Sequence, residues 1–423
     1  MNAWPDVPDF PELRFPEGLD AQGFLARYWQ RQPLLMRQAL PGFDNPLPAD
    51  ELAGLACEPD CESRIVLERG EQGAERSAWQ VRHGPFDAER FAALPSSHWT
   101  LLVQDVDKHI PEIGALLERF AFLPRWRIDD LMVSYAEDQG SVGPHVDEYD
   151  VFLIQAEGRR RWRIATDPNL SLACIPDLEI RVLQQFSADQ DWLLEPGDIL
   201  YLPAGVPHWG IAEGPCQTWS LGLRAPAWRE LADDWLAQVA ERFTPAGHWR
   251  DPPPVTPPRD PAELDAETIS LLRARIESGL AAASGEDFQA WLGAWLTEPK
   301  LNLALEPPDQ PWSTEAVIAV LETDGRLERD GRSQMLFAGP SAGSSTGPNT
   351  DPSAEEGMAV SLFANGQAYW LPGDLVPVAS LLANSRVLEL ERIRPWLGRE
   401  EVQALLGALF NAGHFIASND QPW

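Results

Sequence analysis

Residues 143–164 read GPHVDEYDVFLIQAEGRRRWRI, and this segment carries the clearest indication of the fold. It contains a His-x-Asp pair, an apolar run, and a basic run that alternates with Trp162 and Ile164. Short apolar runs bounded by turn residues are typical of buried β-strands. Similar runs lie on either side, and many short strands separated by turns favour a β-sandwich or barrel. Strands are expected at residues 131–136, 149–156, 160–165, 180–183, 191–194, 198–202 and 217–223.

Helical patterns flank this β-rich region. Apolar and aromatic side chains at helical spacing predict a helix over residues 21–40. The dipeptide Asn365-Gly366 separates two apolar runs, as in a two-residue β-hairpin. Residues 251–261 are proline-rich and are interpreted as a stiff connector, and residues 338–357 are interpreted as a disordered low-complexity loop. Further helices are expected at residues 226–243, 262–282, 286–297 and 400–411.

Composition restricts the classes of function. The chain has 423 residues, enough for two or three domains, and 44% of them are hydrophobic, so a large core is expected. Its formal net charge of −32 argues against a nucleic-acid partner and favours a cationic one. Four cysteines do not make a disulfide framework. No signal peptide and no membrane-spanning run are found in the sequence, so a cytoplasmic protein without membrane attachment is expected.

Two histidines and one aspartate form a candidate metal site. On a strand, residues i and i+2 point to the same face, so His145 and Asp147 can reach one metal ion. A Pro-Gly turn and a short apolar strand precede His208, and in a barrel this arrangement places His208 beside the first pair. Two imidazoles and one carboxylate suit Fe(II) and leave coordination positions open. The same set also fits catalytic zinc, and each histidine alone fits a buried core position.

Strand alternation singles out Arg160. It shares a face with Trp162 and Ile164, which should be buried, whereas the arginines of the other parity should face solvent. A buried guanidinium needs an anion, and the distal carboxylate of 2-oxoglutarate is one candidate. An internal salt bridge to an acidic residue is the alternative. Ser134, on the strand before the metal motif, is a further candidate to donate to the same carboxylate.

With these residues in place, the chain resembles the bacterial JmjC-type ribosomal oxygenases. The resemblance lies in GPHVDEYDVFLIQAEGRRRWRI (143–164), EPGDILYLPAGVPHWG (195–210), SLGLRAP (220–226) and FLARYWQRQPLLMRQAL (24–40). It implies an α+β chain with a double-stranded β-helix (cupin/JmjC) barrel. It also implies an Fe(II)- and 2-oxoglutarate-dependent dioxygenase that uses O₂ and 3-hydroxylates an arginine of the sixteenth large-subunit ribosomal protein.

The resemblance assigns roles to the candidate residues. His145, Asp147 and His208 correspond to the iron ligands and thus to the catalytic centre. Arg160 corresponds to the anchor of 2-oxoglutarate, and Ser134 corresponds to a hydroxyl in that pocket. A basic ribosomal protein is then the expected partner.

The resemblance also implies a domain order. Residues 1–225 correspond to the catalytic domain, residues 226–305 to a helical dimerisation region, and residues 306–423 to a winged-helix-like domain. A homodimer is therefore expected. No nucleic-acid binding is expected from the third domain, because the net charge opposes it.

Three other functions share parts of this pattern. A 2-oxoglutarate oxygenase acting on a small metabolite would use the same triad but would turn over without a protein substrate. A histone-type demethylase would use the same iron chemistry on an N-methyl carbon. A non-catalytic cupin module would bind a protein or metal and consume no 2-oxoglutarate.

Overall fold

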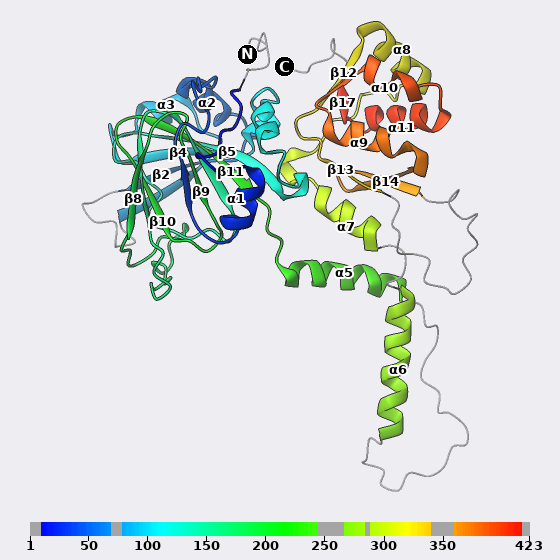
Figure 1. Ribbon diagram of the computed structural model, residues 1–423, viewed down its shortest axis with the longest axis horizontal. Helices are drawn as coiled ribbons and strands as arrows, with labels where there is room; N and C mark the ends of the chain where they lie inside the picture. The colour runs from blue at the N-terminus through cyan, green and yellow to red at the C-terminus, as the bar shows by residue number, and fades with distance from the viewer. Residues whose placement is uncertain (1–9, 69–77, 244–265, 284–287, 340–358, 417–423) are drawn as a thin grey trace. The chain divides into compact units, whose positions relative to one another are not determined.

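The computed structural model describes residues 10–68, 78–243, 266–283, 288–339 and 359–416 (Figure 1). The proline-rich residues 251–261 and nearly all of the low-complexity residues 338–357 lie outside the described residues. The chain divides into two compact units. The first comprises residues 1–225, 299–334 and 384–423, and the second comprises residues 226–298 and 335–383.

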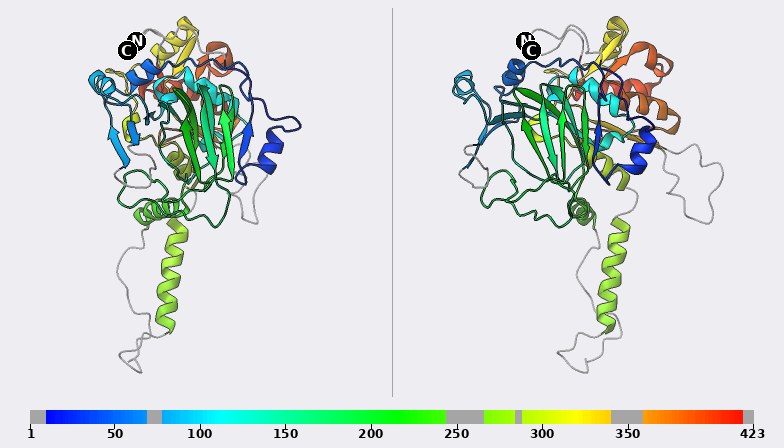
Figure 2. Two further views of the ribbon diagram at one scale, coloured as in Figure 1. Left: turned by 90° about the vertical axis from the view of Figure 1, so that its left-hand side faces the viewer. Right: turned by 60° about the vertical axis from the view of Figure 1, so that its left-hand side comes forward.

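Two antiparallel sheets form the main body of the first unit, as expected for a double-stranded β-helix (Figures 1 and 2). The eight-stranded sheet has the order β1-β9-β6-β11-β5-β4-β2-β3. Its strands are β1 (Leu34–Met36), β9 (Ile199–Leu202), β6 (Val151–Glu157), β11 (Cys216–Leu223), β5 (Ile128–Ala136), β4 (Trp99–Val103), β2 (Ser63–Glu68) and β3 (Trp79–His83). The three-stranded sheet consists of β10 (His208–Ala212), β7 (Arg160–Ile164) and β8 (Gln190–Leu194).

The centre of the large sheet is buried on both faces. Strand β11 pairs with β5 on one side and β6 on the other, and all of its residues are buried. One face packs into a core with aromatic side chains such as Phe24, Phe152 and Trp219. The short helices of this unit are α1 (Ala21–Arg27), α2 (Ala49–Leu55), α3 (Ala88–Ala92), α4 (Val106–His109), η2 (Ile113–Phe120) and η3 (Arg125–Arg127).

Most of the predicted strands are confirmed, but two expectations are wrong. The helix predicted over residues 21–40 ends at Arg27, because Pro33 cannot lie inside a helix and the following residues pair as β1 with β9. Residues 180–183 were predicted as a strand, but this segment makes only an isolated bridge between Cys174 and Leu183. Val182 is buried and Ile180 is half-buried in an apolar cluster, so the apolar pattern reflects packing rather than strand pairing.

The first unit also contains a small sheet and several helices from the C-terminal part of the chain. The sheet has the order β16 (Val387–Glu389), β12 (Arg326–Arg329) and β17 (Phe415–Ile416). Helix α8 (Thr314–Asp324) is capped by the Ser313 hydroxyl, which accepts from the Ala316 N–H, and ends at Gly325 with a left-handed φ of 73°. The remaining helices here are η4 (Leu301–Leu303), α10 (Leu390–Ile393), η7 (Arg394–Trp396) and α11 (Glu400–Asn411).

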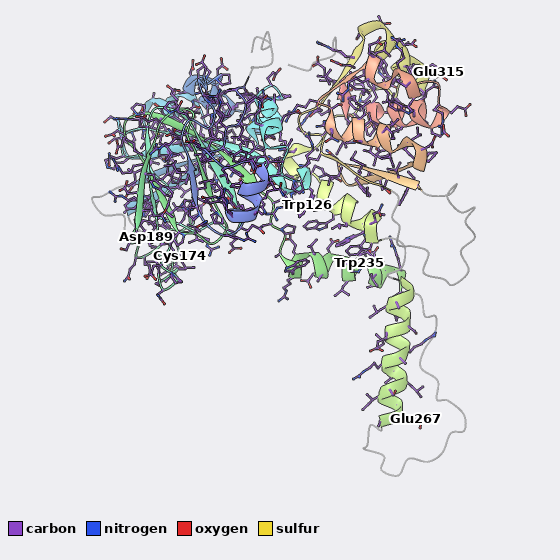
Figure 3. The ribbon with its side chains drawn as sticks, in the orientation of Figure 1. Trp126, Cys174, Asp189, Trp235, Glu267 and Glu315 are labelled. Carbon is purple, nitrogen blue, oxygen red and sulfur yellow. The ribbon has the colours of Figure 1, made fainter. Side chains whose placement is uncertain are left out.

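The second unit contains the expected long helices and the hairpin. Helices α5 (Trp228–Arg242), α6 (Ala266–Ala283) and α7 (Phe288–Thr297) agree with the predictions. Trp235 on α5, labelled in Figure 3, packs against Phe288 and Trp291 of α7. Strand β13 (Met335–Ala338) pairs with the hairpin β14 (Ala359–Ala364) and β15 (Gln367–Pro372), whose turn residues Asn365 and Gly366 both have positive φ. The other helices are η6 (Gly373–Leu375) and α9 (Val376–Asn384).

No helix among the described residues is both long enough and apolar enough to cross a membrane.

Candidate metal centre and its pocket

His145, Asp147 and His208 converge on one point. Their ligand atoms all lie within 4.8 Å of one another, the distance that one bound ion can span. Nε2 of His145 is 3.8 Å from Oδ2 of Asp147, and Nε2 of His208 is 3.5 Å from the same oxygen. The two backbones are joined by an antiparallel bridge, in which each histidine N–H donates to the other's carbonyl at 3.0 and 2.9 Å. This bridge fixes the separation of the two imidazoles.

His145, Asp147 and His208 lie together as predicted, but the prediction that His145 and Asp147 share a regular strand is wrong. His145 and Asp147 do not lie on a regular strand, because His145 makes only the single bridge to His208 and Asp147 follows it in an extended loop. The two side chains therefore converge because the bridge and the loop place them, rather than because a strand alternates. His208 begins β10, as the barrel arrangement implied.

Backbone carbonyls orient both imidazoles toward this point. Nδ1 of His145 donates to the Gly143 carbonyl and Nδ1 of His208 donates to the Val206 carbonyl, each at 2.9 Å. A carbonyl can only accept, so both Nδ1 atoms carry the proton and both Nε2 atoms present a lone pair. Burial, followed by the charge of His145, lowers the pKa of His208 to about 4, so that its imidazole is neutral at pH 7. The donor set thus fits a divalent transition metal held on one side only.

Arg160 is buried without an anionic partner. It begins β7, where residues 160, 162 and 164 are buried and the residues between them are half-buried, as alternation predicted. Its guanidinium makes two long hydrogen bonds, from Nη1 to the Ser134 hydroxyl at 3.4 Å and from Nη2 to the Gly210 carbonyl at 3.5 Å. Its Nε has no partner, and among the described residues no carboxylate pairs with it. The alternative of an internal salt bridge is therefore not observed in the described part of the chain.

The surroundings of Arg160 are shaped to admit this cation. A Cβ added at Gly210 would lie 2.8 Å from its Nε, so only glycine leaves the necessary space. The Trp162 ring lies 5.3 Å from the guanidinium carbon, a cation–π distance. Burial lowers the pKa of Arg160, as expected for a charge that lacks a counter-ion. Such a group is a ready site for an incoming carboxylate.

Ser134 lies beside Arg160 rather than apart from it. Its hydroxyl donates to the Thr218 carbonyl at 3.1 Å and accepts the long bond from Arg160. In this arrangement the hydroxyl orients the guanidinium, and it would have to rotate before it could donate to a bound carboxylate.

One pocket of about 320 Å³ contains all of these groups. Its walls come from both sheets of the barrel, and include β5, β6 and β11 on one side and β7 and β10 on the other. The orphaned indole N–H of Trp162 and hydroxyl of Thr100 also line it. Buried polar atoms without partners are uncommon in folded proteins and here indicate a polar ligand.

Sequence reasoning missed a second acidic residue in this pocket. Asp130 lines the pocket, is buried, and lies on the same face of β5 as Ser134, four residues earlier. Burial raises its pKa to about 7, although the nearby Lys300 lowers it. Tyr149 lines the same pocket. The alternation that singled out Ser134 could have identified Asp130, because both have the same parity.

Two domain families match the chain. Residues 115–231 match the JmjC domain, and residues 279–415 match the ROXA-like winged helix.

Relatives and solved structures agree with these matches. The chain is 34% identical to the ribosomal protein uL16 3-hydroxylase of Escherichia coli strain K12, over 93% of this chain and 96% of that protein. It is 39% identical to a probable ribosomal oxygenase of Haemophilus influenzae, over 52% of this chain and 53% of that one. The structure of YcfD, a ribosomal oxygenase from Escherichia coli, in complex with cobalt and 2-oxoglutarate superposes with a TM-score of 0.76 at 32% identity, covering 96% of this chain and 99% of that one.

Proposed function

Because this chain belongs to the JmjC-type ribosomal oxygenases, we propose that it 3-hydroxylates an arginine of a large-subunit ribosomal protein, with uL16 as the first candidate. The chain is a 2-oxoglutarate-dependent dioxygenase that requires Fe(II). The observation that supports the reaction most strongly is the combination, in one pocket, of a one-sided His-Asp-His cluster with a buried, anion-free arginine.

The roles of the pocket residues follow from their positions. We assign His145, Asp147 and His208 as the ligands of Fe(II), which, when bound, supplies the activation of O₂ that lets one oxygen atom enter the substrate and the other enter succinate, with loss of CO₂. Arg160 would bind the distal carboxylate of 2-oxoglutarate, and Ser134 would hold Arg160 in place. The buried walls keep bulk water from the reacting groups.

An arginine substrate fits the acidic end of the pocket. Asp130 is buried there and has one carboxylate oxygen directed toward Gly222, which also lines the pocket. A substrate guanidinium could form a charge-assisted bond with this oxygen. Tyr149, next to Gly222, offers an aromatic face for the planar group. The net charge of −32 would speed encounter with a basic ribosomal protein.

The organisation of the rest of the chain is part of the same proposal. We propose a catalytic domain at residues 1–225, a dimerisation region at residues 226–305 and a winged-helix-like domain at residues 306–423 that binds no nucleic acid. Exposed apolar side chains follow α6 at spacings of three and four residues, which is the pattern of a helix–helix seam. These side chains are Ile269, Leu272, Ile276 and Leu280. This pattern supports a homodimer, and we place the enzyme in the cytoplasm, where its substrate is made.

Mass spectrometry of the candidate substrate tests the reaction. Recombinant uL16 is incubated with the enzyme, Fe(II), 2-oxoglutarate and O₂. We expect a mass increase of one oxygen atom on one arginine, and no increase with His145→Ala. Arg161→Met is the matched control for handling, because this neighbour of Arg160 forms surface ion pairs with Asp191 and Glu213 outside the pocket.

The other outcomes separate the alternatives. Consumption of 2-oxoglutarate without any protein substrate would favour an oxygenase of small metabolites. Loss of a methyl group from methylated peptides would favour a demethylase. No consumption of 2-oxoglutarate with any basic protein would favour a non-catalytic module.

A further inference from the structure

An ion pair joins two distant segments of the first unit behind the pocket. Nζ of Lys300 lies 2.9 and 3.0 Å from the two carboxylate oxygens of Asp105. The Asp105 side chain is 1% exposed and that of Lys300 is 37% exposed, so the pair is only partly open to water. Removing one partner from a buried pair costs far more than breaking a surface pair, because the other charge is left buried and unpaired.

Asp105 is connected directly to the pocket. It adopts a left-handed conformation with φ of 54°, which is unusual for a residue with a side chain. In this conformation its N–H donates to Oδ2 of Asp130 at 3.2 Å. With Oδ2 bound from behind, Oδ1 is the oxygen nearest Gly222, where an added Cβ would lie 3.1 Å away. The backbone of Asp105 therefore sets which oxygen of Asp130 faces Gly222 in the pocket wall.

The residues that follow Asp105 hold the same strand. Oδ1 of Asp107 accepts the Leu131 N–H at 2.8 Å, and Nζ of Lys108 donates to the Asp129 carbonyl at 2.9 Å. Helix α4 thus forms hydrogen bonds to the residues on both sides of Asp130 at the start of β5. Helix α4 has only four residues and its N-terminus has no side-chain cap, so it is a weak support by itself. Lys300 supplies an anchor at that end.

Lys300 also balances the charge around the pocket. Asp105 and Asp107 both favour the neutral form of Asp130, and Lys300 and Lys108 oppose them. Although burial acts in the other direction, Asp130 and Asp105 raise the pKa of Lys300, so it is fully charged at pH 7. An ionised Asp130 is the form that can bind a guanidinium.

We propose that Lys300 is a positioning residue for substrate binding: through Asp105 it holds the carboxylate of Asp130 in the orientation that receives the substrate cation. This inference rests on the proposed function, because it takes Asp130 as the group that receives the substrate. It also gives residues 299–334 of the first unit a role in substrate binding, although none of them lines the pocket.

The test compares Lys300→Met and Lys300→Arg with the wild-type enzyme. A matched control is Arg326→Met, which removes an exposed cation from its ion pair with the half-buried Glu328 in the same segment. Initial rates with uL16 give kcat and the KM values for the protein and for 2-oxoglutarate. We expect Lys300→Met to raise the KM for the protein about tenfold or more, the usual worth of a charged hydrogen bond. The KM for 2-oxoglutarate should not change, and Lys300→Arg should recover most of the loss.

Two kinetic results would overturn the inference. One is a protein KM within twofold of wild type in Lys300→Met. The other is an equal rise of both KM values, which would indicate general loss of structure; Lys300→Gln is the milder variant to use if Lys300→Met does not fold.

A second measurement keeps the two proposals separate. Hydrogen exchange of the Asp105 amide reports its bond to Asp130 without any substrate. If wild-type enzyme does not hydroxylate uL16, the proposed function fails, yet faster exchange in Lys300→Met than in wild type would still support the positioning role. Unchanged exchange would refute it.

Discussion

Replacement of Arg160 by methionine tests whether the unpaired guanidinium destabilises the free enzyme and binds 2-oxoglutarate. Methionine is similar in length and has no charge, so Arg160→Met removes the guanidinium with little change in packing. What is lost is small: two hydrogen bonds of 3.4 and 3.5 Å and a contact with the Trp162 ring. What is gained is relief from burying a cation that is 3% exposed and has no carboxylate partner among the described residues.

The magnitudes can be compared. Replacing buried ionic groups by apolar ones of similar volume is often neutral or stabilises by about 1–4 kcal/mol. A cation–π contact in such a setting contributes roughly 1–2 kcal/mol in the other direction. The free energy of unfolding of the metal-loaded enzyme without 2-oxoglutarate should therefore equal or exceed that of wild type. Binding of 2-oxoglutarate should weaken by about 2–5 kcal/mol, because its carboxylate would be buried without a cation, which corresponds to roughly 30-fold or more in Kd.

Thermal unfolding and calorimetry measure both effects. At a 2-oxoglutarate concentration of about 100 times the wild-type Kd, wild-type enzyme should gain about 2.7 kcal/mol, and Arg160→Met should gain about 0.9 kcal/mol or less. Arg161→Met, on the other face of β7, should bind 2-oxoglutarate as wild type does. A Kd for Arg160→Met within threefold of wild type would show that the guanidinium does not hold the co-substrate. A large drop in the Tm of the 2-oxoglutarate-free variant would show that Arg160 has a structural partner.

Two further predictions concern substrate binding and assembly. Because burial raises the pKa of Asp130 to about 7, its carboxylate becomes neutral as the pH falls through 7, so the KM for the basic protein should rise below that pH. Asp130→Asn should have a high KM for the protein at all pH values. Because ionisation of the buried Asp130 destabilises the folded state, this variant should gain more in Tm at pH 8 than at pH 5. A wild-type KM that does not change with pH would contradict this role. Ile276→Lys places a charge in the apolar stripe of α6, where Ile276 is 52% exposed, and should convert a dimer to monomer in sedimentation experiments. A wild-type enzyme that is already monomeric at micromolar concentration would contradict the proposed dimer contact through α6.

The parts of the fold that sequence predicted well depend on local periodicity. The alternation in β7 that separates Arg160 from Arg161 is a property of any strand, and it is observed. The hairpin at Asn365-Gly366 follows from the positive φ values that these two residue types tolerate. The failures arose where a local pattern does not decide strand pairing. Ile180 and Val182 pack into an apolar cluster, yet their segment forms only one isolated bridge.

In the candidate site, too, some features could be predicted from the sequence and others only from the structure. Residue types and spacing were enough to select His145, Asp147, His208 and Arg160, because a facial triad and a buried cation both have signatures in a short stretch of chain. Sequence could not show that Arg160 lacks an acidic partner, since that depends on which side chains the two sheets bring together. Asp130 had the right parity to be found, but parity alone does not distinguish a pocket from a core.

The candidate metal and carboxylate-binding residues can therefore be identified from local motifs, whereas the proposed positioning of Asp130 depends on tertiary contacts. Few residue types bind Fe(II) or a carboxylate, so the candidate residues for both can be selected from the sequence. The pair between Lys300 and Asp105 joins residues 195 positions apart, and no periodicity predicts such a contact. Only the folded chain brings them together, because burial of the core, rather than local backbone preference, fixes the distances between distant segments.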